Sequence, residues 1–529
     1  MGRCEKWLER FGKTPIELAE AVRARYGKDR TFAVPILTTC ALAGLVSWSE
    51  VPPLPFELAC FPQSWFRFLR LHVVSYALPA LIAIGQAVHH HRPPRNPITR
   101  LVRALSRKRS LRVLERIQPS SGGYLEATPL TSFVTLSLAA CGLADHAVAK
   151  NAVRFLVASV RPDGSWPIDT NLATWVTTLS INALATAGEL QSLDRLDAVR
   201  DWLLGQQYKD RHLYTGAAPG GWAWTDLPGG VPDADDTPGA VIALGHLGRT
   251  GPTPPPLSAP GEWERQEAAF KRYGAPRLRA FLWLCGLQNF DGGIPTFCRG
   301  WGKLPFDRSG TDLTAHMIRG SAATWGHWAR GLALGEYSRP GLTIDKLSLD
   351  AFRGAMKTLP GALRFLARTQ RPDGSWLPLW FGNQHAPNDQ NPTYGTARVL
   401  AAYRDLKMMN ELPAQRGVAW LLANQNLDGG WGGCLGTPSS IEETSLAAEI
   451  LCDAGPSAAD AVDRGLGWLV DRIEQGGLYD PTPIGFYFAK LWYYEKLYPM
   501  IFAVAALGRA RRRSDKSEPR PSGSGVLAP

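Results

Sequence analysis

The sequence predicts an all-α protein in which repeated helical hairpins close into a ring, an α/α barrel. A short phrase recurs as SVRPDGSW (159–166), TQRPDGSW (369–376) and NQNLDGGW (424–431). Looser copies, each with a Gly, begin at positions 117, 205, 287 and 472. The copies sit between segments whose apolar residues recur at helical spacing, which is typical of a helical repeat protein.

The residues of the repeat explain how it joins two helices. Asp-Gly or Gly-Gly reverses the chain after one helix. The Gln and Trp of each copy are expected to hydrogen-bond and stack against the start of the next helix. Copies lie about 40 to 80 residues apart, the length of one helical hairpin plus insertions. Six or so hairpins closed in a ring give the barrel.

Length and composition bound the architecture. With 529 residues, the chain is long enough for two domains with sizeable cores. The 19 Trp residues indicate a repeated packing device or an aromatic-lined cavity, because a buried indole N–H needs a partner. The tail 511–529 is basic and rich in Ser, Pro and Gly, which predicts disorder.

The net charge of +11 is concentrated in two basic clusters, at 92–112 and 509–513. The first follows two apolar runs, 32–48 and 73–88, which are shorter than the roughly 20 residues that a membrane-spanning helix needs. Apolar surface beside cationic residues is typical of a protein that dips into one leaflet. We therefore expect 49–113 to be a membrane-interfacial segment; an ordinary contact between domains is the alternative.

The remaining composition narrows the class of protein. Eight scattered cysteines without CxxC spacing, and no secretory signal at the start of the chain, indicate a protein that faces the cytosol. No nucleic-acid-binding motif is present. The run His89–His91 has no acid or Cys nearby to complete a metal site, and we assign it to the basic interfacial patch.

Three carboxylates lie within four residues in PDADDT (232–237). Like charges this close raise the pKa of the last proton, so that Asp233, Asp235 or Asp236 can be held protonated as an acid. The competing interpretation is a helix start, with Asp236 or Thr237 as the N-cap and Pro238 as the first helical residue. A cap uses only one acceptor, and a calcium site lacks the further oxygen ligands, so an acid function stays open beside the cap.

Together these motifs resemble those of the squalene–hopene cyclase family. The repeats are similar to its QW motifs and PDADDT to its DxDD acid motif, and DLTAH (312–316) and NPTYGT (391–396) follow in the family's order. The resemblance covers roughly residues 30–508. It implies bacterial monotopic membrane enzymes that fold squalene in a cavity between two α-barrel domains and cyclise it through carbocations. This chain is shorter, which implies a smaller, partial α-barrel domain at 1–165 beside the α/α-barrel catalytic domain at 166–510.

The resemblance also implies roles for the residues of the acid site. Asp235 would protonate a terminal alkene, flanked by Asp233 and Asp236. His316 would hydrogen-bond the acid, and a protonated imidazole there would favour the carboxylate left behind. No metal or cofactor is implied, because the proton comes from Asp235.

Aromatic faces would stabilise the cation, each by about 0.5 to 2 kcal/mol, without trapping it. By motif, the substrate-side positions are Trp175, Trp224, Thr225, Trp301, Asp312, Trp380, Tyr394, Tyr487 and Tyr494. Thr225 stands where the family has Gln, and Tyr487 lies in the region that cradles late cations. The Trp residues inside the QW copies, Trp166, Trp376 and Trp431, are predicted to pack the repeat instead.

The sequence therefore predicts a class II terpene cyclase that converts squalene, or a similar linear polyprene, into a polycyclic triterpene at the cytoplasmic face of a membrane. One alternative is a class II diterpene cyclase acting on a prenyl diphosphate. It would need a Mg²⁺ site and a basic pocket, and the barrel repeats show no such cluster. The other alternative is a non-catalytic lipid-binding toroid. A homodimer is compatible with each.

Overall fold

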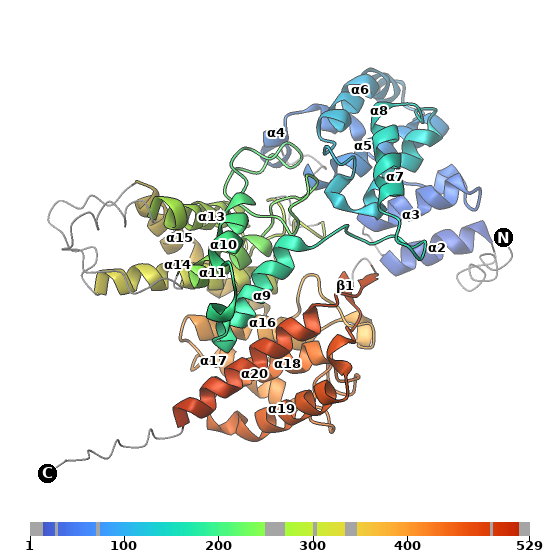
Figure 1. Cartoon of the computed structure of the whole chain (residues 1–529). Helices are drawn as coiled ribbons and strands as arrows, with labels where there is room; N and C mark the ends of the chain where they lie inside the picture. The colour runs from blue at the N-terminus through green and yellow to red at the C-terminus, as the bar shows by residue number, and fades with distance from the viewer. Residues whose placement is uncertain are drawn as a thin grey trace, which may run out of the picture.

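The computed structural model is almost entirely helical, which confirms the predicted class (Figure 1). It describes residues 14–26, 30–69, 75–248, 270–299, 304–333, 346–486 and 490–517. Within these residues the strands are β1 (Ile484–Phe486) and β2 (Leu491–Tyr493), which pair antiparallel in one hairpin. No helix of the described chain is both long and apolar enough to cross a membrane.

Six inner helices form a closed ring, because each contacts the next and the last returns to the first. In ring order they are α9 (Ala173–Ala187), α11 (Asp236–Leu247), α14 (Thr311–Ala333), α16 (Pro392–Asp405), α18 (Ile441–Leu451) and α20 (Tyr498–Ser517). The predicted α/α barrel is thus confirmed. Helix α20 continues to Ser517, so the first seven residues of the predicted disordered tail are helical.

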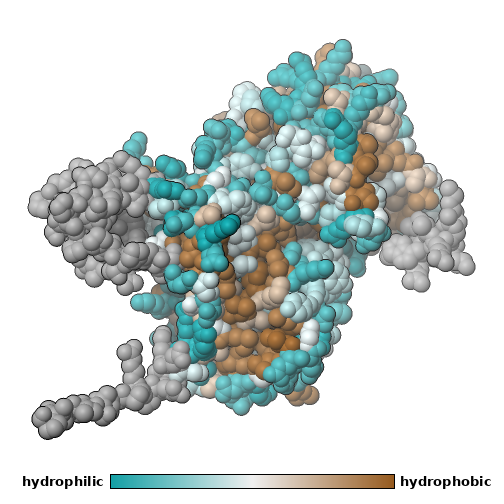
Figure 2. Space-filling view, in the orientation of Figure 1, coloured by the Kyte–Doolittle hydropathy of each residue, from teal (hydrophilic) through white to brown (hydrophobic). Residues whose placement is uncertain are grey.

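Outer helices alternate with the inner ones along the chain. They are α10 (Leu196–Gly205), α13 (Ala275–Leu287), α15 (Lys346–Thr369), α17 (Leu412–Ala423) and α19 (Ala459–Glu474), and the π-helical turn Phe270–Gly274 precedes α13. The described chain supplies no sixth outer helix between α20 and α9. In Figure 2, apolar residues gather over this seam.

The N-terminal residues build a smaller helical domain. Its helices are α2 (Pro15–Tyr26), α3 (Arg30–Leu42), α4 (Gln63–Phe68), α5 (Leu78–His91), α6 (Pro97–Arg116), α7 (Thr128–Ala140) and α8 (Ala147–Ala158). Helix α5 packs against α6 and α7, and α3 packs against α7. The two predicted apolar runs become α3 and the largely buried α5. The loop 159–172 leads from α8 into the barrel.

The QW turn tethers two outer helices, α15 and α17. In the copy at 369–376, the Trp376 indole N–H donates to the Leu366 carbonyl of the preceding helix α15 at 2.7 Å. The Gln370 amide donates to the carbonyl of Pro413 at the start of the next outer helix, α17, at 2.8 Å. The Trp376 ring packs on Gly417 of α17, where a Cβ would come within 2.8 Å of it. The expected Gln and stacking contacts are confirmed, whereas the Trp hydrogen bond runs back to the preceding helix.

Other copies repeat this geometry. Gln425 donates to the Ala461 carbonyl at the start of α19, and the Trp431 indole donates back to Leu421 at 2.8 Å. Trp166 makes the same backward bond, to Leu156, yet 53% of the residue is exposed. Its packing role is weaker because no barrel hairpin precedes it.

Basic residues near the C-terminus belong to the barrel. Arg511 and Arg512 of α20 donate to the carbonyls of Ala187 and Ala185 at the C-terminal end of α9. Cations at this end of a helix also interact favourably with its dipole. Part of the second basic cluster therefore closes the ring between α20 and α9.

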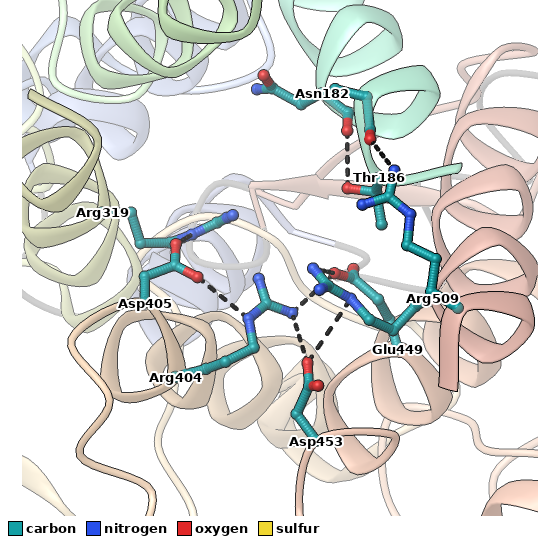
Figure 3. A network of polar contacts seen from close by, with 10 residues as sticks. Asn182, Thr186, Arg319, Arg404, Asp405, Glu449, Asp453 and Arg509 are labelled. Carbon is teal, nitrogen blue, oxygen red and sulfur yellow. Dashed lines mark hydrogen bonds and ion pairs between the residues drawn. The ribbon is translucent and has the colours of Figure 1, made fainter. Parts of the chain in front are cut away.

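An ion network joins four inner helices (Figure 3). Arg319 of α14 contacts Asp405 of α16 at 2.8 Å, and Arg404 contacts both Asp405 at 3.1 Å and Glu449 of α18 at 2.9 Å. Arg509 of α20 reaches Glu449 at 3.7 Å. Burial alone would raise the pKa of Glu449, but the charges of Arg404 and Arg509 hold it below its usual value. The network links neighbouring helices across half of the ring.

Replacing Arg404 with Leu is expected to lower the free energy of unfolding by about 3 kcal/mol, because Asp405 and Glu449 lose their shared cation. Urea unfolding followed by circular dichroism measures the change. Arg353→Leu is the matched control: Arg353 is 69% exposed and 3.8 Å from Asp350, so the shift should stay below about 0.5 kcal/mol. Equal stabilities of the Arg404→Leu variant and the wild type would contradict a stabilising role.

Candidate active site

The acid motif forms the first turn of α11, which begins at Asp236. The Asp233 carboxylate accepts hydrogen bonds from the backbone N–H groups of Asp235 and Asp236, each at 2.8 Å. Asp233 is therefore the capping side chain, and the predicted cap at Asp236 or Thr237 is wrong. Pro238 is the third helical residue rather than the first, a position where its missing N–H costs no helical hydrogen bond.

Two of the three carboxyl groups are buried. Burial raises the pKa of Asp233 to about 7, and it raises the pKa of Asp236 well above its usual value, helped by the charges of Asp233 and Asp235. The raised pKa favours the neutral form of Asp236, in line with the predicted ability of the cluster to hold a proton.

Asp235 is the member of the cluster that reaches outward, with 23% of its side chain exposed. Its Oδ1 lies 2.6 Å from Nδ1 of His316, which α14 contributes from the neighbouring position of the ring. Burial lowers the pKa of His316, which disfavours the imidazolium that the resemblance implies. A neutral ring with its proton on Nδ1 donates to Asp235 and leaves the second carboxyl oxygen of that residue for another partner.

A cavity of about 920 Å³ opens in front of the acid cluster, and Asp233, Asp235 and Asp236 lie in its wall. Its lining comes from both domains, for example Leu81 of α5 and Trp175 of α9. The aromatic lining residues are Phe32, Tyr76, Phe133, Trp175, Trp224, Phe297, Phe306, Trp380, Phe381, Phe486, Tyr493, Tyr494 and Tyr498. The volume is at the upper end of the range for small-molecule sites, about 300 to 1,000 Å³.

Four of the predicted aromatic residues line this cavity: Trp175, Trp224, Trp380 and Tyr494. Trp175 lies with its ring centroid 6.4 Å from that of His316, and its indole N–H donates to the hydroxyl of Tyr498 at 2.7 Å. Tyr494 is 64% exposed and stands at the rim. The predicted positions Trp301 and Tyr487 lie outside the described residues.

Three other predicted residues lie away from the cavity lining. Tyr394 is buried behind Phe381, which packs on its ring at a centroid distance of 4.7 Å and takes the position in the wall. Asp312 is buried and accepts a hydrogen bond from the N–H of Leu379 at 3.0 Å. Thr225 is buried as well, and its hydroxyl donates to Asn171 at 2.5 Å. These side chains are therefore placed to support the wall rather than to touch a ligand.

The sequence analysis missed several aromatic residues of the wall. The ring centroid of Phe297 lies 6.0 Å from those of Trp224 and Trp380, and the centroid of Phe306 lies 5.1 Å from that of Trp380. A signal was present, because Trp224, Phe297 and Trp380 each follow a repeat turn by two to four residues. A position shortly after each of these turns therefore lies at the cavity.

Comparisons with known proteins agree with this geometry. The family model of the squalene–hopene cyclase C-terminal domain matches residues 341–512. The probable squalene–hopene cyclase of Sinorhizobium fredii is 24% identical over 573 residues, covering 92% of this chain and 80% of that protein. The squalene–hopene cyclase of Bradyrhizobium diazoefficiens is 26% identical over 377 residues, covering 65% of this chain and 49% of that protein. The C-terminal third of the chain therefore matches the squalene–hopene cyclase family, and the similarity to these cyclases extends over most of the chain.

The similarity extends to the fold. The solved structure of ent-copalyl diphosphate synthase from Streptomyces platensis matches 93% of this chain and 91% of its own, with a TM-score of 0.50 and 16% identity. The chain spans about half the length of the Bradyrhizobium relative. The chain is thus a class II terpene cyclase, and it combines a cluster of carboxyl groups with an aromatic-lined cavity.

The pH dependence of stability tests the buried carboxyl groups. Burial raises the pKa of Asp312 to about 7 from the usual 3.8, so the folded protein retains a proton that the unfolded chain releases. The stabilising contribution of that proton is complete below about pH 4 and is lost as the pH rises through about 7. Asn cannot ionise, and its carbonyl can still accept from Leu379.

We therefore expect Asp312→Asn to be more stable than the wild type at pH 8, by about 2 to 4 kcal/mol, and to match it near pH 4. Thermal unfolding from pH 4 to 8 measures the difference. Asp145→Asn, at a carboxyl that is 97% exposed, is the control and should follow the wild-type curve. A constant offset between Asp312→Asn and wild type at every pH would refute the ionisation argument.

Proposed function

We propose that this class II cyclase protonates a terminal alkene of squalene, or of a similar linear polyprene, and closes the chain into a polycyclic triterpene. The observation that carries the proposal is the position of Asp235, whose carboxyl is partly exposed at the wall of an aromatic-lined cavity of about 920 Å³. The O–H bond of Asp235 breaks and its electron pair stays on the carboxylate, while the π electrons of the terminal double bond form the new C–H bond. The π electrons of the next double bond then attack the resulting carbocation and form the first ring bond.

An isolated alkene is a weak base, so the carboxylate left on Asp235 must be stabilised where water is scarce. His316 donates a hydrogen bond to it at 2.6 Å. Asp235 is also the N-cap residue of α11, where the helix dipole favours negative charge. The faces of Trp175, Trp224 and Trp380 then meet the cation as it moves along the folded chain.

The charges of the cavity wall favour a neutral hydrocarbon. Asp169 and Glu495 line the cavity in addition to the acid cluster, and Arg161 is the one basic residue among the described lining residues. A diphosphate would therefore face five carboxyl groups and one guanidinium. Such a substrate remains the second candidate because a drimenyl diphosphate synthase of Streptomyces showdoensis is 29% identical over 220 residues, 41% of this chain.

Asp235→Asn is expected to reduce cyclisation of squalene by at least about 1,000-fold, because an amide cannot supply the proton. Purified protein is incubated with detergent-dispersed squalene, and the lipid extract is analysed by gas chromatography with mass spectrometry. Asp226→Asn, in the exposed part of the same loop, is the matched control and should keep wild-type activity.

Each outcome of this assay separates the candidates. Undiminished cyclisation by Asp235→Asn would reject the acid assignment. Activity of the wild type on geranylgeranyl diphosphate, with none on squalene, would favour the diphosphate cyclase. Squalene binding without any cyclised product would favour the lipid-binding toroid.

We further propose that one face of the N-terminal domain rests on the cytoplasmic surface of a membrane. Along α6, the apolar side chains of Ile98, Leu101, Val102 and Leu105 are exposed, the last of them by 73%. Arg100 and Lys108 of the same helix flank this stripe. Helix α6 packs on the 3₁₀ turn 56–60, and the exposed Phe61, Trp65 and Phe68 follow that turn. Apolar residues beside cations match an anionic leaflet.

The double substitution Leu101→Asp and Leu105→Asp is expected to weaken binding to vesicles of mixed phosphatidylcholine and phosphatidylserine at least about tenfold, since it puts charge on the apolar stripe. Cosedimentation measures the bound fraction. Leu427→Asp is the control, because Leu427 is fully exposed on a repeat turn of the other domain. Equal losses in both proteins, or none in either, would show that α6 does not carry the contact.

A further inference from the structure

A second, very small pocket lies behind the acid, on the barrel side of Asp235. Its volume is about 10 Å³, room for roughly one water molecule. The lining residues are Asp235, Asp312, His316, Arg319, Tyr394 and Arg398. Asp235 is shared with the large cavity, whereas Arg398 lines the small pocket alone. The acid therefore has an apolar side, which faces the substrate, and a polar side, which faces the barrel.

Among the basic side chains of this pocket, Arg398 differs from the other two. Arg319 forms its ion pair with Asp405 at 2.8 Å, and burial lowers the pKa of His316. Arg398 makes no ion pair within the described residues, and its buried Nη2 atom has no hydrogen-bond partner there. A buried guanidinium without a carboxylate is costly, so its retention calls for a reason.

The guanidinium of Arg398 is held in place by two aromatic rings. Its central carbon lies 4.9 Å from the ring centroid of Tyr394 and 5.3 Å from that of Phe502. Tyr394 precedes it by one turn of α16. The guanidinium lines the same small pocket as the Asp235 carboxyl.

We propose that Arg398 is a positioning residue that supplies the positive charge for the carboxylate formed at Asp235. The inference rests on the proposed function. When the O–H bond of Asp235 breaks and the proton bonds to the alkene carbon, one negative charge appears on Asp235 and one positive charge appears on the substrate. The guanidinium stabilises the negative charge on Asp235 from the barrel side. Asp235 itself lies between the guanidinium and the carbocation.

This arrangement assigns to Arg398 the electrostatic role that the sequence suggested for a protonated His316. The imidazole keeps its hydrogen bond to Asp235, and the full charge comes from a group that stays protonated at every working pH. Asp312 lines the same pocket and has an Oδ2 atom without a hydrogen-bond partner in the described structure. A water molecule in the pocket would join Arg398, Asp312 and Asp235.

The test compares wild type, Arg398→Gln and Arg398→Lys on squalene. Arg398→Gln is expected to lower kcat about 100-fold with little change in KM, because the charge acts on the proton transfer and not on substrate binding. Arg398→Lys keeps the charge and should recover at least a tenth of wild-type kcat.

The alkaline limb of the kcat profile should move to higher pH in Arg398→Gln, because an acid site without its cation releases its proton less readily. That profile reports on the coupled groups Asp233, Asp235, Asp236, Asp312, His316, Arg319, Tyr394 and Tyr498.

Arg319→Gln is the matched control. Arg319 also lines the pocket but is already paired with Asp405, so the kcat of this variant should fall much less. Thermal unfolding checks that every variant is folded, and squalene binding is measured on each. Equal losses in the Gln and Lys variants with an unshifted pH profile, or wild-type kcat in Arg398→Gln, would overturn the proposal. A wild-type protein that cyclises no polyprene would instead reject the proposed function.

Discussion

The bonds from two backbone N–H groups to the Asp233 carboxylate determine the position of the whole acid site. They begin α11 one residue after Asp235 and place that residue at the boundary between barrel and cavity. Three identical side chains thereby acquire three different environments. Asp233 caps the helix, Asp236 is buried with a raised pKa, and Asp235 keeps an accessible oxygen. The surroundings of each carboxyl group therefore decide whether it supports the helix or is accessible from the cavity.

The closed ring provides the second requirement, because the groups around the acid come from different helices. Asp235 stands before α11, His316 lies on α14, Arg398 on α16 and Trp175 on α9. None of these helices places its side chain without its neighbours in the ring. The QW turns and the ion network of Figure 3 therefore act on the chemistry indirectly, since they set the spacing between helices that share one site.

The sequence was sufficient to predict the repeated hairpins and the contacts that local motifs set. It did not predict features that depend on how deeply a side chain is buried. Three QW copies were sufficient for the α/α barrel, and motif order was sufficient to pair His316 with Asp235. The burial that lowers the pKa of His316 depends on how α14 packs, which the sequence pattern does not give. Tyr394 was assigned to the cavity, but Phe381, which precedes it in the chain, fills that place. Periodicity does not reveal which of two neighbouring rings faces a cavity.

The junction between the two domains connects this packing to the shape of the cavity. Asp389 of the barrel domain pairs with Lys490 at the end of the β1–β2 hairpin and lies 3.9 Å from Arg25 of α2. Glu442 in the first turn of α18 accepts two hydrogen bonds from Thr482, just before β1.

The hairpin is thus tied at both ends to residues outside it, and its side chains Phe486, Leu491 and Tyr493 form part of the cavity wall. Another part of the cavity wall comes from the smaller domain and includes Leu81 and Phe133. The shape of the cavity therefore depends on how the two domains hold this hairpin between them. Arg25 and Asp389 lie outside the cavity lining, yet they influence its shape because they help to fix that wall.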